Sequence, residues 1–163
     1  MNINVRKFNI GDINEAIDIW NSVVDEGMAF PQTEILTKSK GKEFFKAQSY
    51  VGIAEDADSS KIVGLYILHP NGIGRCSHIC NASYAVEKGL RGQKVGEALV
   101  IDCMKEAKMH GFLILQFNAV VKSNTPALHL YEKLGFTKLG TIPKGFLNKK
   151  GKYEDIIPHY RVL

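Results

Sequence analysis

The sequence predicts an α/β domain in which a mixed sheet is flanked by helices. Segments with alternating or continuous apolar residues, typical of strands, lie between segments whose apolar residues recur every three or four positions, typical of helices. One long helical segment joins two apolar strand-like segments, as in a crossover between parallel strands. The chain of 163 residues is long enough to bury one core, and we expect a single domain covering residues 1–163.

The first half of the chain predicts one strand, two helices and a hairpin. Residues 2–8 alternate between apolar and polar side chains, which is typical of a strand. Apolar residues at helical spacing then continue as far as Gly27, where the helix is expected to end. They are Ile13, Ala16, Ile17, Trp20, Val23 and Val24. A second helix is expected at about residues 38–48, and residues 49–55 and 61–69 predict an antiparallel hairpin around a polar turn.

The second half predicts a crossover followed by a helix and two strands. Residues 77–86 form the next predicted strand. The helix after it has a buried stripe of Val95, Leu99, Cys103 and Ala107, and ends at Gly111. The apolar run at residues 112–121 predicts a buried strand parallel to its predecessor. The remaining elements are expected to be a helix at residues 125–134 and strands at residues 136–142 and 153–162.

Composition and charge exclude several classes of protein. The formal net charge is +4 and no basic run with interleaved aromatic residues occurs, so we expect no nucleic-acid partner. No apolar run approaches the roughly 18 residues that span a bilayer, so we expect no membrane partner. The N-terminus lacks the apolar segment of a secretory signal. Because Cys76, Cys80 and Cys103 are not spaced like metal ligands, we expect no metal, free thiols and a cytoplasmic location.

A loop rich in glycine and basic residues joins the strand that ends at Val86 to the long helix. Glycines at positions 89, 92 and 96 allow the backbone to approach a ligand closely. The helix start offers unpaired N–H groups and the positive end of its macrodipole, and Arg91 and Lys94 add charge. Together these features predict a phosphate or pyrophosphate site. The alternative is a connection whose glycines only relieve strain and whose basic residues are solvated.

Two segments in this order resemble motifs of the GCN5-related N-acetyltransferases. The family's Gln/Arg-x-x-Gly-x-Gly/Ala signature is similar to Arg91-Gly92-Gln93-Lys94-Val95-Gly96, with Lys94 where the family usually has glycine. The family's Asn-x-x-Ala-x-x-Leu-Tyr-x-x-x-Gly-Phe segment is similar to the stretch from Asn124 to Phe136. The resemblance covers about residues 49–136. It implies a mostly antiparallel mixed sheet whose two central parallel strands splay apart.

The same resemblance implies acetyl-coenzyme A as the cosubstrate. The backbone N–H groups of the matching loop would bind its pyrophosphate, with Arg91 beside them; these loop residues are Gly92, Gln93, Lys94, Val95, Gly96 and Glu97. The strand segment Tyr84, Ala85 and Val86 would pair with the pantetheine arm. Asn124 matches a residue that contacts the cosubstrate, although a helix N-cap is its alternative role.

Tyr131 matches the family's usual general acid. A phenol of pKa about 10 is protonated at neutral pH and can give its proton to a departing thiolate. The alternative is an aromatic side chain packed in the core. No carboxylate stands where several family members place a base, so we expect water-mediated deprotonation, with His78 as an alternative.

Asn81 and Asn118 each interrupt an apolar β segment, where an amide must be hydrogen-bonded. A backbone hydrogen bond or a sheet irregularity is one explanation. The other is suggested by residues 117–120 which, with Asn81 upstream, resemble the proline-analogue (azetidine-2-carboxylate) acetyltransferases. That resemblance implies that the two amides hold the acceptor's carboxylate and aid catalysis. The resemblance to the GCN5-related N-acetyltransferases implies that the region of the first two helices, with the loop at residues 28–31, covers the acceptor end of the cleft, unless Met28 and Phe30 simply pack.

The function expected from these features is acetyl transfer from acetyl-coenzyme A to the amine of a small molecule or amino acid. The transfer would occur by direct attack in a ternary complex. A protein or peptide N-acetyltransferase and a non-catalytic acyl-coenzyme A sensor are the alternatives. The acceptor, the acyl-chain preference and a homodimer are left open by the sequence.

Overall fold

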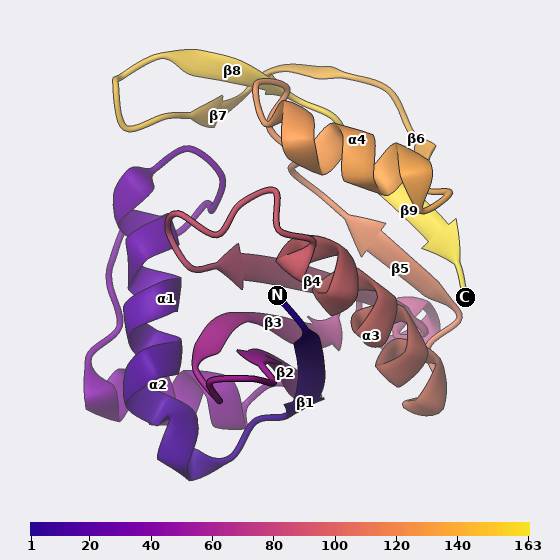
Figure 1. Ribbon diagram of the computed structural model, residues 1–163. Helices are drawn as coiled ribbons and strands as arrows, with labels where there is room; N and C mark the ends of the chain where they lie inside the picture. The colour runs from indigo at the N-terminus through magenta and orange to yellow at the C-terminus, as the bar shows by residue number, and fades with distance from the viewer.

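The computed structural model describes residues 1–163 as four α-helices and nine strands (Figure 1). The helices are α1 (Ile13–Glu26), α2 (Lys38–Lys46), α3 (Val95–Met109) and α4 (Thr125–Lys133). The strands are β1 (Ile3–Lys7), β2 (Tyr50–Asp56), β3 (Ile62–Pro70), β4 (Ile79–Val86), β5 (Ile114–Phe117), β6 (Thr137–Lys138), β7 (Ile142–Leu147), β8 (Tyr153–Ile156) and β9 (His159–Val162). The predicted helices are confirmed. No helix is long and apolar enough to cross a membrane.

Seven strands form one sheet in the order β1-β2-β3-β4-β5-β9-β6. Only β4 and β5 are parallel neighbours, and α3 is their crossover. Their ladder joins Ile79 to Ile114 and Cys80 to Leu115 and then stops, although β4 continues to Val86. The edge of β4 that faces β5 is therefore unpaired over most of its length. This confirms the predicted fold, a mostly antiparallel sheet with two central parallel strands that splay apart.

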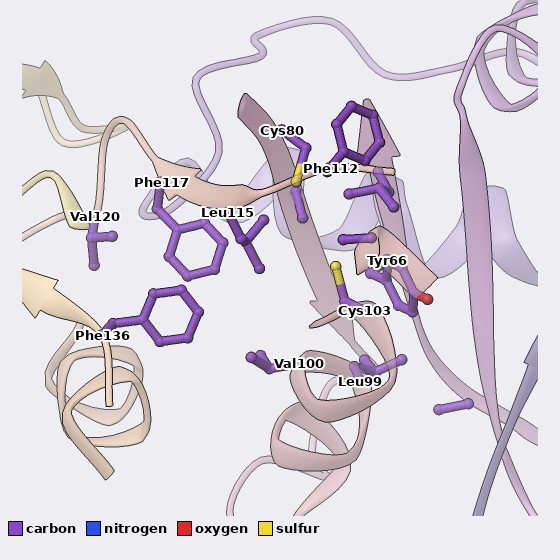
Figure 2. Close-up of a cluster of buried hydrophobic side chains, with 14 of the residues drawn as sticks. Tyr66, Cys80, Leu99, Val100, Cys103, Phe112, Leu115, Phe117, Val120 and Phe136 are labelled. Carbon is purple, nitrogen blue, oxygen red and sulfur yellow. The ribbon is translucent and has the colours of Figure 1, made fainter. Parts of the chain in front are cut away.

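The sheet separates two hydrophobic cores. The core under α1 and α2 contains Trp20 and Phe45 together with Ile53, Leu65 and Ile67 of the sheet. The other core contains the apolar stripe of α3, which packs on side chains of the opposite sheet face. Figure 2 shows Leu99, Val100 and Cys103 of α3 below side chains of β4 and β5, with Phe117 facing Phe136. From Leu65 to Leu68, successive residues of β3 alternate between the cores, which explains why this part of the strand is apolar on both faces.

Three predicted strands differ from the observed ones. The run at residues 112–121 is a strand only from Ile114 to Phe117, because the chain then leaves the sheet and pairs with β8. The predicted strand at 136–142 is instead the short β6 followed by the start of β7. The predicted strand at 153–162 is divided into β8 and β9 at Pro158, which has no N–H to donate to a ladder. Strands β7 and β8 form a separate hairpin above the sheet (Figure 1).

Candidate active site

The splay between β4 and β5 is flanked by two adjoining cavities. The first, which we call the loop cleft, has a volume of about 520 Å³ and lies between the loop before α3, the start of α4 and the end of α1. The second, which we call the inner compartment, has a volume of about 190 Å³ and lies between β4, the end of β5 and residues 29–31. Both cavities are lined by Ala29, Tyr84, Asn124, Ala127 and Tyr131. These five residues mark the junction where two ligands could meet.

The loop cleft ends at a row of unpaired backbone donors. The N–H groups of Gly92, Lys94, Val95, Gly96 and Glu97 have no acceptor in the protein. Lys94 is the N-cap of α3 in the left-handed conformation, with φ 65°, and this explains why the family prefers glycine there. Free N–H groups at a helix start favour a phosphate or diphosphate. The unpaired edge of β4 beside them can pair with an extended arm, so this chain fits the ligand that the resemblance implies.

Some of the predicted cosubstrate residues do not face the cleft with their side chains. Ala85 and Val95 are core residues on opposite sides of the sheet. The N–H of Gln93 donates to the carbonyl of Leu90 within the loop. The other predicted residues line the cleft: Tyr84, Val86, Arg91, Gly92, Lys94, Gly96, Glu97 and Asn124. Asn124 also accepts the N–H of Ala127 at 3.4 Å, so its cap role and its place at the junction coexist.

The charges around the loop cleft are mostly paired. Arg91 forms an ion pair with Glu26, the last residue of α1. The carboxylate of Glu97 accepts two hydrogen bonds from Lys133, at 2.7 and 2.8 Å. Lys94 lines the cleft and forms no ion pair, so its charge is free for a ligand.

The sequence did not lead us to expect Glu26 at this site, although the position of the acidic residues in α1 was a signal. Asp25 and Glu26 occupy the last turn of α1, where the negative end of the macrodipole disfavours acidic residues. Acidic residues at this unfavourable position indicate that basic side chains from elsewhere in the fold pair with them. The partners are Arg91 for Glu26 and Lys149 for Asp25.

Tyr131 lies at the junction of the two cavities. Its ring packs against Phe117 at 4.5 Å, Phe136 at 5.5 Å and His159 at 5.7 Å between ring centroids. Burial raises the pKa of the Tyr131 hydroxyl above its ordinary value, so the phenol keeps its proton at neutral pH. Tyr131 is therefore a packed aromatic residue and also a protonated phenol at the junction, where a proton donor would be needed.

Asn81 and Asn118 both line the inner compartment, where no charged residue does. The amide of Asn81 donates to the carbonyl of Gln116 at 2.9 Å, just past the last paired residues of β4 and β5. Asn118 accepts from the side chain of Gln116 at 3.0 Å and donates to that of Asn71 at 2.6 Å. The backbone hydrogen bond of the alternative explanation is thus present at Asn81, whereas Asn118 bonds only to side chains, and each amide keeps one N–H and at least one lone pair. His78 is exposed and lines neither cavity.

The buried groups near the junction are neutral. Cys80 and Cys103 are buried free thiols, which confirms the expectation of free cysteines. Burial also raises the pKa of the Tyr84 hydroxyl, which lies beside the Cys103 thiol. No cluster of three or more metal-binding side chains occurs in the structure.

Fold and cleft together define an α/β protein with a site for an extended diphosphate ligand next to a small second compartment. The sequence profile of the Acetyltransferase (GNAT) family matches residues 18–136. Because this match takes in more than half of the chain, the protein belongs to the acetyltransferase (GNAT) family. Membership confirms the predicted class, an acetyltransferase that takes its acyl group from acetyl-coenzyme A.

Individual relatives agree with this assignment. N-acetyltransferase aca1 of Schizosaccharomyces pombe is 28% identical over 137 residues, which cover 75% of this chain and 66% of that protein. A GCN5-related N-acetyltransferase from Kribbella flavida has a TM-score of 0.89 at 30% identity, covering 99% of this chain and 98% of that one.

A structure below 25% identity supports the fold alone. The phosphinothricin acetyltransferase of Sinorhizobium meliloti, solved with AcCoA, has a TM-score of 0.91 at 17% identity and covers 100% of this chain and 89% of its own.

Proposed function

We propose that this protein transfers an acetyl group to the amine of a small carboxylate-bearing molecule, such as an amino acid or a proline analogue. The observation that carries the proposal is the inner compartment. It meets the loop cleft at Tyr131, presents the amides of Asn81 and Asn118 and is lined by no charged side chain. Its volume of about 190 Å³ corresponds to roughly six water molecules, which suits a compact acceptor.

The polar groups of the compartment favour an anionic group over a protonated one. A protein lysine brings an ammonium group, and a polyamine brings more than one, into a space that has no carboxylate to pair with it, which is costly, whereas an amino acid brings its own carboxylate. The unused N–H groups of Asn81 and Asn118 can instead donate to a carboxylate. This balance supports the small acceptor over a protein lysine.

The proposed reaction is direct attack of the amine on the thioester in a ternary complex. Acetyl-coenzyme A supplies the activated acyl group and the leaving thiol. The amine must lose its proton before it attacks, and because no carboxylate or histidine lines the compartment, water takes this proton in the proposed reaction. The two asparagines orient the acceptor, and Tyr131 gives its proton to the departing thiolate and regains one from solvent.

The proposal is tested by measuring thiol release from acetyl-coenzyme A with amino acids, proline analogues, polyamines and peptides, in parallel with Tyr131→Phe. Turnover restricted to the small carboxylate-bearing amines, and lost in the variant, is the expected result. Turnover with peptides alone would overturn the proposal and identify a protein or peptide N-acetyltransferase. Tight coenzyme A binding without any turnover would establish a non-catalytic sensor.

The proposed setting is the cytoplasm, because the cysteines are free thiols suited to a reducing compartment. The proposed partners are acetyl-coenzyme A and the small acceptor, with neither nucleic acid nor membrane. A homodimer would be tested by sedimentation of the pure protein.

A further inference from the structure

A third cavity lies on the far side of the inner compartment. It has a volume of about 520 Å³ and lies between residues 24–35 and the β7–β8 hairpin; we call it the hairpin cavity. Ala29 lines both the loop cleft and the inner compartment, whereas Phe30 and Pro31 line both the inner compartment and the hairpin cavity. Three consecutive residues therefore form the partition between three cavities.

The partition is held firmly at Phe30. The Phe30 side chain is only 8% exposed, and its ring packs on Trp20 with centroids 4.5 Å apart. On one side of it, the carbonyl of Gly27 accepts the N–H of Lys149 at 2.9 Å. On the other side, Leu36 exchanges two hydrogen bonds with the side chain of Asn21, at 2.8 and 2.9 Å. The contact with Trp20 therefore places the ring between the cavities, and the two anchors tie down the ends of the segment that carries it.

Apolar atoms form most of the surface of the hairpin cavity, which has no net charge, although Gln32, Thr33 and Asn148 also line it. Its apolar lining includes Val24, Ile35, Phe146 and Leu147. Its two charged residues, Asp25 and Lys149, pair with each other at 2.9 Å. A group that entered this cavity from the inner compartment would therefore be favoured if it were apolar and uncharged.

We propose that Phe30 is a specificity-determining residue that restricts the acceptor to the inner compartment by closing it off from the hairpin cavity. The inference rests on the proposed function, because it takes the inner compartment as the acceptor site. With the ring in place, an acceptor that carries an apolar extension beyond the inner compartment meets Phe30. Without the ring, the extension enters a space that already has an apolar lining.

The test compares wild type with Phe30→Ala and Phe30→Leu. The acceptors share one amine and one carboxylate and carry progressively longer apolar substituents. The quantity measured is the ratio of kcat/KM for an extended acceptor to that for the smallest one. Phe30→Ala should raise this ratio by about tenfold or more, as expected when a pocket gains room for further methylene groups. Phe30→Leu should raise it less.

The matched control is Ile35→Ala. Ile35 lines the hairpin cavity only and is 59% exposed, so its truncation should change neither folding nor the ratio. Phe30→Ala removes a buried ring and is therefore expected to destabilise the protein, so thermal unfolding checks that the variant is folded. Phe30→Leu keeps an apolar side chain and answers the question if the alanine variant is unfolded.

The outcomes separate this proposal from the proposed function. If wild type uses the small acceptors and the folded Phe30 variants leave the ratio unchanged, the partition role is wrong and the proposed function stands. Wild-type turnover that is already equal for short and extended acceptors would also overturn the partition role. No wild-type turnover with any small acceptor would overturn the proposed function, and the role of Phe30 with it.

Discussion

Lys94 combines two effects that substitution can separate. Its left-handed backbone, with φ 65°, costs a residue with a Cβ about 1–2 kcal/mol relative to glycine. Lys94→Gly removes this strain but adds conformational freedom to the unfolded chain, worth about 0.5–1 kcal/mol. The net gain expected is therefore about 0.5–1 kcal/mol, which for a chain of this size raises Tm by about 1–4 °C.

The same substitution removes the one cation of the loop cleft that has no ion-pair partner. A unit charge about 4 Å from a phosphate charge contributes about 1 kcal/mol in high dielectric, and Lys94 is exposed. Lys94→Gly should therefore weaken acetyl-coenzyme A binding about fivefold, and less so at high salt.

Lys94→Ala is the matched control, because it removes the charge and keeps the strained conformation. Calorimetric titration should give the same loss of affinity for both variants, whereas thermal unfolding should show a higher Tm for the glycine variant alone. Equal Tm values would refute the backbone argument. Unchanged affinity in both variants would refute the contact between Lys94 and phosphate.

Three further predictions concern the site. Tyr131→Phe should lower kcat by about 10²–10⁴-fold with little change in coenzyme A affinity. Wild-type kcat should rise as the acceptor amine loses its proton and should show no alkaline decline up to about pH 10, because burial raises the pKa of the Tyr131 hydroxyl; an earlier decline would contradict the assignment. Asn81→Ala, which also frees the carbonyl of Gln116, should cut turnover in steady-state assays while titration shows unchanged coenzyme A affinity. Glu26→Gln should tighten acetyl-coenzyme A binding several-fold, because it removes a negative charge from the cleft, at a stability cost below about 1 kcal/mol; weaker binding would mean that Glu26 serves to orient Arg91.

Local patterns were enough to predict most of the fold. Helices α1, α3 and α4 have apolar stripes and clear ends, such as Gly27 in the left-handed conformation, so period and capping agree. The strands after α3 were predicted less well. The apolar run from Phe112 to Val121 contains a strand of the main sheet and then a segment that pairs with β8. Both parts are apolar, so hydropathy does not distinguish them.

The candidate site shows a similar division. The loop before α3 was predictable because its glycines and basic residues are adjacent in the sequence. The ion pair of Arg91 with Glu26 joins residues 65 positions apart, so the loop's own sequence could not reveal it. The partition at Phe30 depends on the β7–β8 hairpin, which was not predicted: only the start of β7 fell within an expected strand, and β8 was expected to continue into β9.

The tie between the end of α1 and the hairpin has a consequence for folding kinetics. Lys149 binds Asp25 across 124 positions of the chain, whereas the loop cleft is bounded largely by residues between Tyr84 and Tyr131. Contacts between distant residues require closure of a long loop and tend to form late. During refolding from denaturant, we expect coenzyme A binding to recover before discrimination among acceptors does.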